Sequence, residues 1–390
     1  MHRPHDLALP CGNSDGMKDL PHWAHHSAHY RVPQRRGSYC LTRKGRILVV
    51  LVLWLLQSAA LAGAGEGKVR VAGSGWVVDA PTKIADRLGL FGGTSARPPV
   101  QVDYHASGLQ AMRALLAGQA EFALAAPLPV AAAILEHAKA GEAPERAIVV
   151  LASVGMSNQS HYVVANRRRG VLEAEDLVGR RIGLPIHTSA HYGWYLHTVA
   201  NGLDPRDMQL MDIPVDQHAH ALQAGEVDAV VTWDPFGRQL LDQLGEQGVV
   251  FSTRQLHSVN WLLVTTRDLA LDQPALVRRI LYGYLQASDL IFRDPARARA
   301  IHAEATDLDV AELERMEQGV FWNVALNWAV LTNLEAQLEW LARERDPGAA
   351  AQPVVADYLH PAPLNALRPR AVMLPRHIFH RRNDHEATSP

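Results

Sequence analysis

Small hydroxyl side chains stand at three points where a predicted strand gives way to a predicted helix. Ser74 follows the first strand, Ser107 the second, and Thr188 and Ser189 a later one. A helix N-terminus has unpaired N–H donors and a partial positive charge, so it attracts anions. Junctions of this kind converge at the carboxyl ends of strands in an open α/β sheet, where they can share one ligand. Each junction by itself is better explained as an ordinary helix cap, whereas several on one rim favour a site.

Two tryptophans also follow predicted strands. Trp76 comes just after the first strand, and Trp233 opens the segment Trp233-Asp234-Pro235. An indole at a strand exit can form one wall of a pocket for a small molecule. Asp234 offers a carboxylate that can accept a hydrogen bond from an amine. The alternative is that both tryptophans pack in the core and Asp234 belongs to a turn.

The chain after residue 64 lacks the common catalytic motifs. It contains no Gly-x-Ser-x-Gly, no GxxxxGK[ST] and no His-Glu-x-x-His. His187 and His191 stand four residues apart, but on either side of a predicted helix start, and no third ligand is placed beside them. We therefore predict no metal, no cofactor and no enzymatic activity.

Strand-like and helix-like stretches alternate from Lys68 onward, which favours an α/β fold with a doubly wound sheet. Ser107 and Gln110 have the spacing of a capping box, and Asp272 is the predicted N-cap of a long helix. Strands are predicted at residues 69–72, 100–104, 121–125, 148–154, 162–165, 181–184, 209–213, 227–231, 249–252 and 260–265.

An apolar run near the N-terminus predicts export. Ten apolar residues, Ile47 to Leu56, follow three basic residues and precede small ones. This order is typical of a cleaved secretory signal, and the run is too short for a spanning helix, which needs about 20 apolar residues. We interpret residues 47–64 as the signal core and cleavage region; the alternative is an uncleaved anchor. Residues 1–46 are then unstructured or reflect a start codon placed too far upstream.

The composition of the exported part narrows its function. Removal of residues 1–64 takes away eight basic and three acidic residues, which changes the formal charge from −2 to −7, and removes both cysteines, Cys11 and Cys40. A chain without cysteine has neither a thiol nucleophile nor a disulfide scaffold. It also has no basic excess that would hold nucleic acid.

Three segments resemble the binding proteins of sulfonate, taurine and nitrate ABC transporters. They are residues 183–192 (GLPIHTSAHY), 225–236 (GEVDAVVTWDPF) and 117–123 (AGQAEFA). The resemblance implies a type II periplasmic binding protein, in which two α/β lobes joined by two crossover strands close on a small solute. It implies ligand contacts at Ser74, Ser107, Thr188, Ser189 and Trp233, with His191 and Asp234 nearby. Trp76 is a further candidate.

The resemblance also predicts domains and partners. Lobe 1 is expected at residues 66–162 and 260–345, and lobe 2 at 163–259. Residues 346–367 then form an extension packed on lobe 1, and 368–390 a disordered tail. We expect a periplasmic monomer, with a small solute and an inner-membrane ABC permease as partners and no nucleic acid.

Two departures from the family pattern concern the pocket. Pro127-Leu128-Pro129 replaces a polar turn, and Thr188 stands where serine is common. No Arg or Lys stands at the junctions, so an anionic solute would be met by dipoles. Three other functions stay open: a binding protein for a thiamine pyrimidine precursor, an enzyme on the same fold, and a ligand-sensing module.

Overall fold

The computed structural model describes residues 68–92, 98–141, 147–159, 161–252, 256–346 and 352–375. All of them belong to one compact unit, Glu66–Pro390. The predicted signal region, the segment before it and residues 376–390 of the predicted tail lie outside the described residues. Among the residues described, no helix combines the length and the apolar character needed to cross a membrane.

The longer strands form two separate sheets of mixed direction. The first has the order β11-β4-β10-β3-β1-β2 and the second the order β7-β6-β8-β5-β9. The bounds in the first sheet are β1 (Val69–Ser74), β2 (Val100–His105), β3 (Phe122–Ala125), β4 (Ile148–Ser157), β10 (Val259–Thr266) and β11 (Val320–Phe321). Those in the second are β5 (Tyr162–Asn166), β6 (Arg181–Leu184), β7 (Gln209–Asp212), β8 (Ala229–Thr232) and β9 (Gly248–Ser252).

In each sheet, parallel strands on one side are joined to antiparallel strands on the other. In the first sheet β1 pairs in parallel with β2 and β3, whereas β10 is antiparallel to β3 and β4. In the second, β6 is parallel to β7 and β8, whereas β5 is antiparallel to β8 and β9. The chain leaves the first sheet after β4 and returns in β10, so two connections cross between the sheets.

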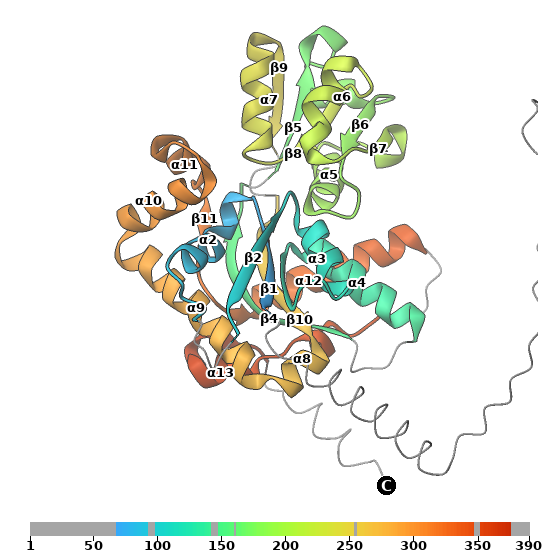
Figure 1. Cartoon of the computed structure of the whole chain (residues 1–390). Coiled ribbons are helices and arrows are strands. Elements are labelled where there is room, and N and C mark those ends of the chain that lie inside the picture. Colours follow the sequence, from blue (N-terminus) through green and yellow to red (C-terminus); the bar gives the residue numbers. More distant parts are fainter. Residues whose placement is uncertain are drawn as a thin grey trace, which may run out of the picture. The chain divides into compact units, whose positions relative to one another are not determined.

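Helices pack around both sheets. Helices α3 and α4 lie side by side next to the first sheet (Figure 1). The bounds of the helices are α2 (Ala80–Arg87), α3 (Gly108–Leu116), α4 (Pro127–Ala140), α5 (Ser189–Ala200), α6 (His218–Ala224), α7 (Phe236–Leu244), α8 (Arg267–Asp272), α9 (Pro274–Arg293), α10 (Pro295–Thr306), α11 (Val310–Met316), α12 (Trp328–Arg345) and α13 (Ala362–Leu367).

The predicted α/β class is confirmed, and each predicted strand overlaps an observed one. The prediction for Asp272 was wrong. Asp272 ends the short helix α8, and Gln273 occupies the N-cap position of α9 without a capping side-chain bond. The sequence could not separate α8 from α9, because Pro274 at the first position of α9 marks a helix start but not whether another helix precedes it.

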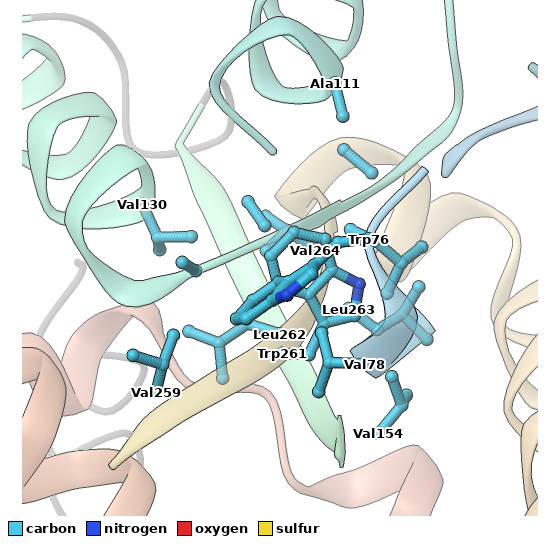
Figure 2. Close-up of a cluster of buried hydrophobic side chains, with 14 of the residues drawn as sticks. Trp76, Val78, Ala111, Val130, Val154, Val259, Trp261, Leu262, Leu263 and Val264 are labelled. Atoms are coloured by element: carbon cyan, nitrogen blue, oxygen red, sulfur yellow. The ribbon is translucent and has the colours of Figure 1, made fainter. Parts of the chain in front are cut away.

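Both β10 and the turn after β1 contribute to the core of the first sheet. Val259–Val264 is buried along its whole length, and Trp261 is 2 % exposed. Trp261 meets Trp76 edge to face, with ring centroids 4.9 Å apart, and Figure 2 shows the two indoles among aliphatic side chains such as Val78 and Leu263. Trp76 therefore belongs to the core as well as to the strand exit.

Part of the predicted C-terminal tail is folded. The Arg368 guanidinium makes two bonds to the Asp289 carboxylate, at 3.0 and 2.7 Å. Just beyond it, β13 (Val372–Met373) pairs in parallel with β12 (Leu326–Asn327). The polar composition of this segment suggested a loose tail, but a forked Arg–carboxylate pair with a partner far back in the chain leaves no local pattern.

Candidate functional site

A small cavity lies where the loops that follow β1, β2, β6 and β8 meet. Its volume is about 20 Å³, close to the roughly 10–15 Å³ that one water molecule needs. Six of the eight predicted site residues line it, and they come from both sheets. The lining residues are Ser74, Trp76, Ser107, Gly108, Leu109, Ala126, Pro129, His161, Thr188, Ser189, Trp233 and Trp261.

Ser74 and Trp76 enter the cavity on the turn that follows β1. The Ser74 hydroxyl oxygen accepts a hydrogen bond from the Trp76 backbone N–H at 3.0 Å. Because that bond uses the oxygen as acceptor, the hydroxyl proton is left for a further acceptor. An anion in the cavity is an acceptor of this kind.

Two buried groups of opposite charge, Asp79 and Lys83, support this turn from behind. Asp79 accepts from the Ser74 N–H at 2.7 Å, and the Lys83 ammonium donates to the carbonyls of Ser74 and Trp76 at 2.9 and 3.0 Å. Burial raises the pKa of Asp79 to about 6, although the positive charge of Lys83 opposes this shift. Burial also lowers the pKa of Lys83 to about 8, although the negative charge of Asp79 opposes it. Thr82 donates a further bond to Asp79. The turn is thus fixed by two desolvated charges.

Ser107 enters the cavity as the N-cap of α3, as predicted. Its side chain accepts from the Gln110 N–H at 3.4 Å. The second half of the predicted capping box is different, because the Gln110 side chain accepts from the N–H of Ala106 and not from that of Ser107. The Ser107 hydroxyl proton is, like that of Ser74, available to an anion.

Thr188 and Ser189 stand at the start of α5, but Thr188 does not cap it with its side chain. The Thr188 hydroxyl donates to the Pro185 carbonyl at 2.7 Å, and no capping side-chain bond is formed. The Ser189 hydroxyl lies 2.9 Å from His161 Nε2. Thr188 therefore occupies the predicted N-cap position but does not form the predicted capping hydrogen bond. The sequence pattern does not reveal that the Pro185 carbonyl accepts from its hydroxyl instead.

Two aromatic lining residues, His161 and Trp261, were not predicted. His161 is 1 % exposed and lies against Trp76 and Trp233, with ring centroids 6.0 and 5.8 Å away. Burial, and then the neighbouring His257, hold the pKa of His161 well below its usual value, so the imidazole is neutral. His161 precedes a strand without any motif, and Trp261 lies inside one, where it resembles a core residue.

Two predicted site residues lie outside the cavity lining. The His191 ring packs edge to face on Trp340 at 5.0 Å, and burial lowers its pKa to about 4. Asp234 accepts from the Tyr162 hydroxyl and from the Arg238 N–H, which places it at the start of α7. Both residues are bonded to or packed against their own neighbours, and neither lines the cavity.

The electrostatic character of the lining is uniform. It contains hydroxyls, indoles, aliphatic groups and one neutral imidazole, but none of the lining residues is Asp, Glu, Lys or Arg. The N-termini of α3 and α5 reach it through Ser107 and Ser189. Such a site favours an anion through helix dipoles and hydroxyl donors. Within the described residues no three His, Cys, Asp or Glu side chains are grouped so that they could hold a metal ion.

A second contact joins helices of the two sheets beside the cavity. Trp340 on α12 meets His191, Tyr192 and Tyr195 on α5, with ring centroids 5.0–5.4 Å apart. Arg345, at the end of α12, pairs with Glu136 and bonds to His187 Nε2 at 3.2 Å. Aromatic packing therefore holds α5 against α12.

Comparison with known proteins gives the family. The model of the NMT1-like family matches residues 63–305, more than half of the chain. The chain is 24 % identical over 226 residues to a taurine-binding periplasmic protein of Escherichia coli strain K12, a match that covers 55 % of this chain and 64 % of that protein. It thus spans less than two thirds of that relative's length.

Solved structures share the fold. The alkanesulfonate-binding protein SsuA from Xanthomonas axonopodis pv. citri, bound to MOPS, aligns with a TM-score of 0.63 and 20 % identity over 76 % of this chain and 100 % of its own. The desulfurization enzyme DSZB aligns with a TM-score of 0.53 and 16 % identity over 78 % of this chain and 99 % of its own. The molecule is thus an α/β protein with the two-lobed fold of periplasmic binding proteins. The chain belongs to the NMT1-like family.

Proposed function

We propose that this protein is the periplasmic solute-binding component of an ABC importer and that its solute is a small sulfonate. The observation that carries the proposal is the uncharged cavity at two helix N-termini, in which Ser74 and Ser107 keep hydroxyl protons for an acceptor. A sulfonate offers three acceptor oxygens and one delocalised charge, which dipoles and neutral donors can bind. The taurine-binding relative and the sulfonate-binding structural neighbour support this choice.

The same lining favours a sulfonate without an amino group. An ammonium in the cavity would be desolvated without a counter-ion, because none of the lining residues carries a carboxylate. The indoles of Trp76, Trp233 and Trp261 offer apolar faces to a carbon chain. We therefore propose that ethanesulfonate binds better than taurine, and that nitrate, which has no carbon chain, binds less well than either.

Capture and delivery follow from the two-sheet arrangement. We propose that each sheet with its helices is one lobe of a clamp and that the lobes separate to admit the solute. The small volume of the cavity supports this, since a sulfonate needs more room than about 20 Å³. The apolar run at residues 47–56 supports export, and the loaded clamp would then dock on a permease.

A ligand screen tests the proposal. The purified protein is heated with ethanesulfonate, taurine, nitrate, sulfate, bicarbonate and a thiamine pyrimidine, and the hits are measured by calorimetry. A ligand at about 100 times its Kd adds roughly 2.7 kcal/mol of stability, which is visible as a rise in Tm. We expect the largest rise with ethanesulfonate. A rise with the pyrimidine and none with any anion would replace the proposal by the thiamine-precursor alternative.

An enzyme on the same fold is the second candidate. It is favoured by the Ser189–His161 hydrogen bond of 2.9 Å, because an imidazole can take the proton of a hydroxyl nucleophile. The fold shared with a desulfurization enzyme points the same way. Incubation of the protein with a bound sulfonate decides between the two: a transport receptor returns the solute unchanged, whereas an enzyme releases sulfite or another product.

A further inference from the structure

A large groove runs beside the small cavity. It lies between α3 and α4, has a volume of about 780 Å³, and is called here the α3–α4 groove. Met112 and Leu116 line it from α3, four residues apart and so on one face of that helix. The facing side of α4 presents Ala133, whose small side chain leaves the space between the helices open.

The groove and the cavity share two lining residues. Leu109, in the first turn of α3, and Pro129, in the first turn of α4, line both. Leu109 therefore separates a narrow space with hydroxyl donors from a wide space that is lined partly by apolar side chains. A solute whose head group occupies the cavity can extend an apolar chain past Leu109 into the groove.

Basic side chains stand along the groove. Arg113 lines it from α3, is exposed, and has no ion-pair partner among the described residues. His187 and Arg345 also line it, together with the acidic Glu136, which is paired with Arg345, and Asp268. An unpaired guanidinium beside the groove attracts an anionic amphiphile and repels a cationic one.

We propose that the solute is a sulfonate with a medium-length apolar chain, whose head lies in the cavity and whose chain lies past Leu109 in the α3–α4 groove. The inference rests on the proposed function and adds to it the size class of the solute. The cavity limits the head group to a compact anion, and the groove supplies the apolar surface that the chain needs to leave water.

Calorimetry with a homologous series tests this inference. Ethane-, butane-, hexane- and octanesulfonate are titrated into the purified protein below their micelle concentrations. We expect the affinity to rise about two- to fourfold for each added methylene up to hexanesulfonate, since full burial of one methylene corresponds to about a fourfold gain.

Variants of α4 locate the chain. Ala133→Trp fills the groove, so it should remove the gain with chain length while the Kd for ethanesulfonate stays within twofold. Ala140 lies at an exposed position of the same groove, so Ala140→Trp should lower the affinity for octanesulfonate but not for the shorter sulfonates. This variant replaces Ala133→Trp in the test if Ala133→Trp does not fold. Ala138→Trp is the matched control, because Ala138 is exposed on α4 but does not line the groove.

The outcomes separate the inference from the function on which it rests. Equal affinity for all chain lengths would overturn the inference and leave the sulfonate receptor standing. The same gain in the Ala133→Trp and Ala140→Trp variants as in Ala138→Trp would also overturn it, because the chain would then lie elsewhere. If none of the four sulfonates binds, the proposed function fails and the inference fails with it.

Discussion

Ser74 and Ser189 face the same cavity from the two sheets, but different groups hold them in place. The turn of Ser74 rests on the buried charges of Asp79 and Lys83, which bond to its backbone at 2.7–3.0 Å. Ser189 meets the neutral ring of His161, and the hydroxyl of Thr188 bonds to a backbone carbonyl.

This difference distinguishes a rigid side of the cavity, at Ser74, from a side that can adapt to a ligand, at Ser189. The loss of one of two buried opposite charges is strongly destabilising, because the other charge then remains in a dry interior without compensation. A neutral hydroxyl–imidazole bond contributes only about 1 kcal/mol and can be exchanged for a bond to a ligand. We infer that the Ser74 turn is a fixed wall and that the Ser189 side adjusts when a solute enters.

The largest effect is expected from Lys83→Met. This change leaves Asp79 buried without its partner and removes the donors to the Ser74 and Trp76 carbonyls. We expect the free energy of unfolding to fall by about 3–5 kcal/mol, measured by urea denaturation. The double variant Asp79→Asn/Lys83→Met should lose less than the sum of the single variants. Additive losses would show that the charges do not act as a pair.

A fall in pH should change the stability contributed by His257, beside Ser189, and by Asp79, behind Ser74, in opposite directions. Burial lowers the pKa of His257, stacked on His161, to about 4, so its contribution to stability is complete above about pH 6.5 and is lost as the pH falls through 4. The pKa of Asp79 is raised to about 6, so its contribution is complete below about pH 3.8 and is lost as the pH rises through 6.

Single variants separate these two contributions. In urea denaturation between pH 4 and 6.5, His257→Gln should remove an acid-induced loss of up to about 3 kcal/mol. Asp79→Asn should instead make the acid-induced loss steeper, because it removes the opposing gain. If both variants change the pH dependence of the free energy of unfolding in the same direction, His257 and Asp79 do not contribute with opposite sign.

Trp233→Ala tests the wall that both sides share. The indole is 5 % exposed and lies against His161, so its loss removes a large apolar face from the cavity. We expect at least about a tenfold loss of ethanesulfonate affinity in calorimetry, from roughly 1–3 kcal/mol of burial. Trp328→Ala, at a 54 % exposed position outside the lining, is the control and should leave the Kd unchanged.

The smallest effect is expected at Thr188. Its hydroxyl bonds to Pro185 and not to the cavity, so Thr188→Val should change the Kd for ethanesulfonate by less than about twofold. Ser189→Ala should weaken the same ligand several-fold, because it removes the hydroxyl that can turn from His161 to an anion. Calorimetry on both variants checks the difference. Equal losses would mean that Thr188 also rotates toward the solute.

Most of the fold could be predicted from the sequence, because its strands are short, apolar and regularly separated from helices. Local signals of this kind gave the positions of Ser74, Ser107 and Ser189 at strand exits. They could not separate α8 from α9, because Pro274 marks a helix start but not the helix before it. They could not find the pairing of β12 with β13 either, because the two strands are distant in the chain.

Six of the eight site residues proposed from the sequence line one cavity, and two do not. His191 and Asp234 belong to motifs that resemble the family, but the resemblance gives their place in the chain and not the direction of their side chains. His161 was missed because it belongs to no motif. Only the crossing of the chain from β4 to β5 brings it within 2.9 Å of Ser189.

The sequence by itself determined the order of elements, the hydroxyls at helix starts and the absence of cysteine after residue 64, because each follows from local residue types. Only the tertiary structure decided which hydroxyls keep a proton for a solute, which charges lie buried behind the cavity, and that a wide apolar groove begins at Leu109. The physical reason is that hydrogen-bond direction, desolvation and cavity volume depend on neighbours that folding brings together from distant parts of the chain.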